Sequence, residues 1–145
     1  MAATPARQLN TFLRRFTPDV RRTAESALRA LRAQVPGATE MVYGKARALV
    51  IGFAPRDRPS EAILSIALYT KWVNLYFLDG ALLSDPSRLL TGTGRRVRMM
   101  RLDDVRVLDS AAVRELIAEA VKNADVPFDP RAGRRILIKQ RGPAR

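Results

Sequence analysis

Residues 39–78, TEMVYGKARALVIGFAPRDRPSEAILSIALYTKWVNLYFL, form the stretch that decides the fold class. It contains four short runs rich in Val, Ile, Leu and aromatic residues, the composition typical of β-strands. Brief connections separate these runs: Gly44-Lys45, the turn-rich APRDRPS, and Thr70-Lys71. Because strands joined by such short connections must be antiparallel neighbours, the stretch predicts an antiparallel sheet.

Helical patterns precede this stretch. The i, i+3, i+4, i+7 spacing of one helical face is met by Leu9, Phe12, Leu13 and Phe16. A second helix is predicted to begin after Thr17, an N-cap residue followed by Pro18, and to stop at Pro36-Gly37. Its predicted buried stripe consists of Val20, Ala24, Ala27, Leu28, Leu31 and Val35.

Another strand and another helix follow the central stretch. RRVRMMRL, residues 95–102, alternates like a strand, and residues 108–125 predict a helix capped by Asp109 or Ser110. We therefore expect a single-domain α+β fold, an α/β sandwich. It would combine an antiparallel sheet of about five strands with two N-terminal helices and one C-terminal helix, packed on one side of the sheet.

A basic tail follows the predicted domain. We place the α+β domain at residues 1–125 and the basic C-terminal tail at residues 126–145. The tail has one short apolar run, Ile136 to Ile138, within Pro/Gly-rich basic sequence. Two interpretations stay open: the run adds an edge strand, or the tail is disordered until it meets a partner.

The composition excludes many kinds of catalytic and metal site. The 145 residues include no Cys and no His, so a Ser-His-Asp triad, a Cys nucleophile, a thiolate metal site and an iron–sulfur cluster are excluded within this chain. No apolar run approaches the roughly 20 residues that span a bilayer. We expect a cytoplasmic protein with no membrane partner, and a binding module rather than an enzyme.

The net charge of +12 directs attention to a glycine-containing loop, LLTGTGRRVRMMRL at residues 89–102. It matches neither a Walker loop, which needs Gly-Lys-Ser/Thr, nor a dinucleotide fingerprint, which needs a following helix. A glycine turn with adjacent cations still suits an anion, such as nucleic acid or another polyanion. The candidate anion-binding residues are Gly92, Gly94, Arg95, Arg96 and Arg98. The alternative is a structural turn with solvated arginines.

The order of several short motifs resembles the YdhG-like family, a domain of unknown function, over about residues 10–122. The motifs are Pro36, Glu40, Tyr43-Gly44, Asp85-Pro86, Leu89-Leu90, Gly92, Gly94, Arg95 and Arg98. The resemblance implies a compact α/β sandwich in which the glycine loop belongs to the fold. Lys45-Ala46 departs from the family pattern, where an apolar residue and a proline are expected.

The resemblance also implies an alternative function, because some family members are described as frataxin-like iron chaperones. Iron would need oxygen ligands, and the candidate carboxylates are Asp103, Asp104, Asp109, Glu115 and Glu119. Iron is the one cofactor considered, and only under this alternative. A further alternative is a small-ligand enzyme with a pocket near strand ends, lined by Tyr43, Lys45, Trp72 and Tyr76. The same aromatics also suit core packing or the stacking of nucleobases.

Overall fold

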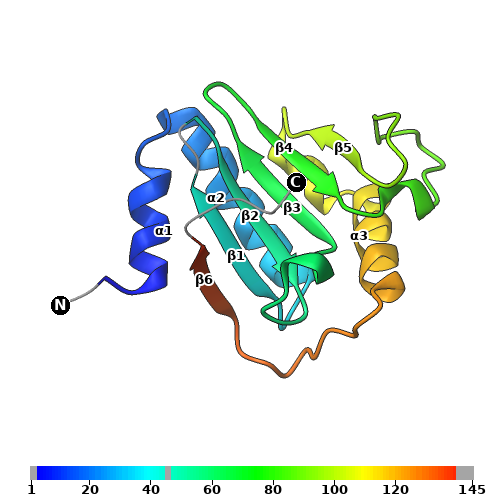
Figure 1. Ribbon diagram of the computed structural model, residues 1–145. Coiled ribbons are helices and arrows are strands. Elements are labelled where there is room, and N and C mark those ends of the chain that lie inside the picture. Colours follow the sequence, from blue (N-terminus) through cyan, green and yellow to red (C-terminus); the bar gives the residue numbers. More distant parts are fainter. Residues whose placement is uncertain (1–2, 45–46, 140–145) are drawn as a thin grey trace.

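A computed structural model describes residues 3–44 and 47–139. One six-stranded sheet has its helices on one side (Figure 1). The helices are α1 (Pro5–Leu13), α2 (Pro18–Gln34) and α3 (Ala111–Asn123), with short 3-10 turns at Pro59–Glu61, Gly80–Leu82 and Val105–Asp109. The strands are β1 (Thr39–Gly44), β2 (Leu49–Ala54), β3 (Leu64–Leu68), β4 (Val73–Phe77), β5 (Arg98–Arg101) and β6 (Arg135–Lys139). The predicted α+β class is confirmed.

The sheet has the strand order β5-β4-β3-β2-β1-β6. The first five strands in this order pair antiparallel through short connections, as the central stretch predicts. Alternation along each strand sends one set of side chains toward the helices, and these form the core: Val42, Leu49, Ile51, Phe53, Leu64, Ile66, Leu68, Val73, Leu75, Phe77 and Met100. The other set lies on the opposite side of the sheet, which we call the outer face.

The helix boundaries follow from their caps. Thr17 caps α2 by accepting a hydrogen bond from the Val20 N–H, and Pro18 occupies the first helical turn, as predicted. Ser110, one of the two predicted caps, accepts from the Val113 N–H at the start of α3. Every residue of the predicted α2 stripe is buried. The apolar faces of α2 and α3 therefore close the core against the sheet.

An ion pair anchors α2 to the sheet. Arg32 donates from Nε and Nη2 to the two carboxylate oxygens of Glu40 on β1, each at 2.8 Å. The Glu40 side chain is fully buried, whereas that of Arg32 is 24% exposed. A carboxylate buried this deeply needs a positively charged side chain beside it, because burying a charge without a partner costs several kcal/mol of folding free energy, on the order of the desolvation penalty.

Strand β6 is the one departure from a purely antiparallel sheet. It lies in the predicted tail and runs parallel to β1, with Thr39 opposite Arg135. A parallel neighbour needs a long crossover, and the chain after α3 supplies it by passing along the ends of the strands (Figure 1). Gly37, at φ +81°, allows this crossover to pass, since a Cβ there would lie 1.8 Å from the Asp129 carbonyl oxygen. The edge-strand interpretation of the tail is therefore correct for Arg135–Lys139.

Candidate functional site

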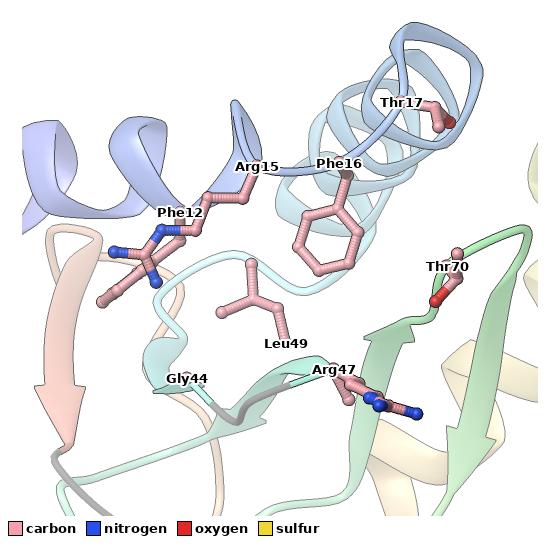
Figure 2. A pocket seen from close by; sticks show the side chains of 9 residues that line it. Phe12, Arg15, Phe16, Thr17, Gly44, Arg47, Leu49 and Thr70 are labelled. Carbon is pink, nitrogen blue, oxygen red and sulfur yellow. The ribbon is translucent and has the colours of Figure 1, made fainter.

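A cavity of about 220 Å³ lies where α1 and α2 meet the ends of β1 and β2. The chain turns from α1 into α2 through residues 14–17, and this corner forms one wall. Gly44 and residues 47–49 form the opposite wall, and Thr70, from the β3–β4 turn, completes it (Figure 2).

Phe12, Phe16 and Leu49 provide the apolar surface of the cavity. The sequence pattern places Phe12 and Phe16 on one core face with Leu9 and Leu13. Leu9 and Leu13 are indeed buried, but the two phenylalanines are only half-buried. Phe16 lies beyond the end of α1 at Leu13, where the chain leaves the core, whereas Phe12 lies in the last turn of α1, and both rings line the cavity. Their rings are therefore available to a ligand.

Two arginines border this apolar surface. Arg15 extends over the ring of Phe12, with its Cζ atom 5.1 Å from the ring centroid. Figure 2 shows the guanidinium group of Arg15 beside Phe12 and the Arg47 side chain on the opposite side of the cavity, with Leu49 between them. Within residues 3–44 and 47–139, neither side chain forms a salt bridge.

The charge balance of the cavity is positive. Its described lining includes Arg15 and Arg47 and contains no Asp or Glu. Thr17, the N-cap of α2, also lines it, so the positive end of that helix dipole adds to the two full charges. The described groups can therefore bind an anion and an apolar surface together.

The glycine loop differs from this cavity. An isolated bridge between Thr91 and Met99 closes it, and Gly92 has φ +127°, a backbone conformation that favours glycine. Arg98 donates from Nη1 to the carbonyl oxygens of Gly94 and Val97, at 2.6 and 2.9 Å. The loop thus binds one of its own cations.

A second arginine of the loop is also engaged. Arg96 donates from Nε to Oδ1 of Asp79 at 2.6 Å, and this hydrogen bond raises the pKa of its guanidinium. The side chain of Arg95 has no salt-bridge or hydrogen-bond partner in the described part of the chain. Of the three arginines predicted to bind an anion, Arg95 is thus the one whose side chain has no contact of this kind, whereas Arg96 and Arg98 each use one nitrogen of the guanidinium group.

The carboxylates proposed for iron are not brought together. Arginine neighbours engage three of them: Asp103 by Arg101, Asp104 by Arg106, and Asp109 by Arg114. The Arg106 hydrogen bonds lower the pKa of Asp104 to about 2. Glu119 accepts from the Ser84 backbone N–H, and it lines a small hollow with Glu115 and Asp85, apart from the three aspartates. Among the described residues, no group of three Asp, Glu, His or Cys side chains is placed to hold a metal ion.

Two of the four residues predicted for a small-ligand pocket, Tyr43 and Tyr76, lie on the outer face of the sheet. Tyr43 is buried there and donates from its hydroxyl to the sulfur of Met41 at 3.8 Å. Trp72 and Tyr76 lie together on β4 and the turn before it, and Lys45 lies outside the described residues. Burial raises the pKa of Tyr43, and burial followed by a hydrogen bond to Tyr76 raises the pKa of Tyr69 to about 12.

Sequence reasoning missed the cavity residues Arg15, Phe16 and Arg47 as a group. They come from segments that are separate in the chain, and each has an ordinary local role: a helix end, an apolar stripe and a turn. Phe16 was the one signal in the sequence. It continues the apolar stripe of the first helix up to the residue before Thr17, the cap of the second helix, where a buried side chain is not required.

Comparison with protein-family models, with curated proteins and with solved structures gave no match. Membership of the YdhG-like family therefore stays a prediction. Within the described residues, none of the helices has both the length and the apolar character needed to span a membrane.

Proposed function

We propose that this protein is a binding module for a small organic anion, which it holds in the α1–α2 cavity. Arg15 and Arg47 bind the anionic groups, and Phe12, Phe16 and Leu49 contact the apolar body of the ligand. Arginine suits this role because its planar fork matches carboxylate and phosphate oxygens and because it is always charged.

The observation that carries the proposal is the pair of guanidinium groups beside an apolar cavity without a carboxylate in its described lining. Several other arginines already form a salt bridge with a carboxylate of the described chain, and Arg32, Arg56, Arg96 and Arg106 are examples. An unpaired cation beside apolar surface has its charge available for a ligand.

The arrangement of the two guanidinium groups narrows the range of ligand shapes that suit the cavity. With Arg15 at one end and Arg47 at the other, a ligand with an anionic group at each end and an apolar spacer between them suits the cavity best (Figure 2). A compact anion such as inorganic phosphate would leave the apolar surface of the cavity bare.

Isothermal titration calorimetry with a series of ligands of one shape tests this proposal. Terephthalate carries a carboxylate at both ends of a ring, benzoate carries one, and benzamide carries no charge. We expect affinity to fall in that order, with about a fivefold loss for each carboxylate removed, a size typical of charge-assisted hydrogen bonds at an exposed site. Equal affinity for all three ligands, or no binding of any, would overturn the proposal.

Three matched substitutions locate the site. Arg15→Ala and Arg47→Ala should each reduce terephthalate affinity to about that of benzoate for the intact protein. Arg14→Ala is the control, because Arg14 is the exposed neighbour of Arg15 and does not line the cavity. If Arg14→Ala weakens binding as much as the other two, the effect comes from net charge and the cavity is not the site.

The other functions raised by the sequence have weaker support. A polyanion site on the glycine loop is opposed by the contacts of Arg96 and Arg98, and an iron site by the cations and backbone N–H that already engage Asp103, Asp104, Asp109 and Glu119. The cavity has neither disadvantage, so we prefer it.

A further inference from the structure

A second group of side chains lies on the outer face, away from the cavity. It consists of Tyr69, Trp72, Asn74, Tyr76 and Arg101, and we call it the aromatic cluster. Its members come from β4, from β5 and from the connection between β3 and β4. Asn74 and Tyr76 alternate with core residues on β4, so the register of the sheet places them on the face that the helices leave uncovered. Trp72 and Arg101 also border the start of α2, where they line a hollow with Asp19 and Thr23.

Contacts within the cluster fix the orientation of its rings. The rings of Tyr69 and Trp72 lie 5.8 Å apart at an interplanar angle of 40°. The hydroxyl oxygens of Tyr69 and Tyr76 are 3.0 Å apart, and Asn74 donates from Nδ2 to the Tyr76 hydroxyl at 3.3 Å. Arg101 lies opposite Asn74 and places its Cζ atom 4.9 Å from the Trp72 ring centroid.

The cluster is nevertheless accessible from solvent. Trp72 is 39% exposed, which is unusual for a residue with so much apolar surface, and the Arg101 side chain is 53% exposed. The salt bridge from Arg101 to Asp103 is itself exposed, so little free energy opposes its exchange for another anion.

An unsatisfied acceptor lies beneath the exposed rings. Asn74 is only 6% exposed, and its Oδ1 atom has no hydrogen-bond partner in the described part of the chain. Buried polar groups are normally satisfied, so this acceptor is an uncommon feature of the cluster. The Oδ1 atom is itself shielded from solvent, so the surface that a ligand can contact is provided by the exposed rings and by Arg101.

We infer that the aromatic cluster binds single-stranded nucleic acid, with bases stacked on Trp72 and the neighbouring tyrosines and with Arg101 on the backbone. Three ring side chains beside an arginine are the combination that single-strand sites use, because every base has a π-face that can stack. A duplex hides its base faces and cannot use the cluster in this way. The net charge of +12 favours the same partner.

The single tryptophan of the chain makes this inference directly measurable. Trp72 emission is followed while a single strand of about 12 nucleotides, within the length that one small binding domain covers, is added. Stacking should quench the emission in a saturable manner, and a duplex of the same sequence should bind at least about tenfold more weakly. Absence of quenching at low salt, or equal affinity for the duplex, would overturn the inference.

Substitutions then separate stacking from charge, with anisotropy of a labelled strand as the readout. Trp72→Leu should weaken binding about tenfold, whereas Trp72→Phe retains a ring and should stay within about threefold of the original affinity. Arg101→Ala should weaken binding more than Arg106→Ala, which removes a more exposed charge that is also paired with an aspartate but lies outside the cluster. If Trp72→Leu binds normally, or if the two arginine variants are indistinguishable, the cluster is not the site.

The two proposed sites are distinguishable in one experiment. Arg15→Ala removes a cavity residue and should leave the Trp72 quenching curve unchanged, apart from the small general effect of one charge that Arg14→Ala also produces. Circular dichroism melting of each variant confirms that the protein remains folded.

Discussion

The glycine loop and the α1–α2 cavity both concentrate arginines, yet they use them in opposite ways. In the loop, Arg96 binds Asp79 and Arg98 binds two carbonyl oxygens of its own turn. In the cavity, Arg15 and Arg47 have no carboxylate partner among residues 3–44 and 47–139. The comparison teaches that the density of arginines along the chain is a poor guide to binding, because what matters is which guanidinium groups the fold has already used.

The largest expected effect on stability concerns Arg32, which forms two hydrogen bonds with the buried carboxylate of Glu40. Arg32→Ala should lower the free energy of unfolding by about 3 kcal/mol, near the lower end for a broken buried ion pair because Arg32 itself is partly exposed. The loss arises because Glu40 would keep a buried negative charge without its partner. Urea unfolding followed by circular dichroism measures it.

Arg15→Ala is the control for this first prediction, since a cavity arginine without a carboxylate partner should change stability by no more than about 0.5 kcal/mol. Similar losses of unfolding free energy in the two variants would contradict the distinction between arginines that pair with a carboxylate and arginines that do not.

The next largest effect separates the two glycines of the loop. Gly92→Ala should cost about 1–2 kcal/mol, because Gly92 has positive φ and a Cβ would lie 3.3 Å from the Val97 carbonyl oxygen. Gly94→Ala should be nearly neutral, since nothing lies within 4 Å of its Cβ position. The two melting temperatures give the comparison, and equal losses would argue against a purely conformational role for Gly92.

A smaller effect extends the comparison to hydroxyl groups. Burial and the Tyr76 hydrogen bond raise the pKa of Tyr69 from 10.0 to about 12. Between these values the unfolded chain has released this proton and the folded chain retains it, so stability should be unaffected below pH 10 and should fall as pH rises toward 12. Urea midpoints across this range, with Tyr69→Phe as the comparison, should show a shallower decline for the variant. An identical decline would assign the effect to other tyrosines, of which Tyr43 also has a raised pKa.

The smallest expected effect tests whether removing its carboxylate partner makes a loop arginine available to an anion. Asp79→Asn removes the partner of Arg96, so the protein should elute from a heparin column at slightly higher salt. Asp125→Asn removes the same charge near Arg96 without breaking a direct contact, and it provides the matched control. Coincident elution of the two variants would show that the Asp79–Arg96 pair does not withhold the cation.

The sequence predicts those parts of the fold that depend on neighbours in the chain. The spacing of Val20, Ala24 and Leu31, together with the Thr17 cap, defines α2 because a helix is built from contacts three and four residues apart. The antiparallel order of β1 to β4 follows in the same way from short connections.

Other features depend on contacts between distant parts of the chain, which periodicity does not contain. The parallel position of β6 beside β1 requires the whole crossover after α3. The cavity requires Phe12, Arg47 and Thr70 to meet, and none of these residues has an unusual local pattern. The pairing of Arg96 with Asp79 likewise depends on how the loop folds back on the 3-10 turn.

The position of β6 also has a consequence for synthesis. The chain emerges from the ribosome with β1 first, and β1 pairs with β2 as soon as that hairpin is complete. Its other edge can pair only when Arg135–Lys139 have emerged, since the partner of Thr39 is Arg135. Until then the nascent chain presents an unpaired strand edge of the kind that recruits other chains. Pairing of this second edge of β1 therefore follows formation of the β1–β2 hairpin, and the edge is exposed to other chains in the interval.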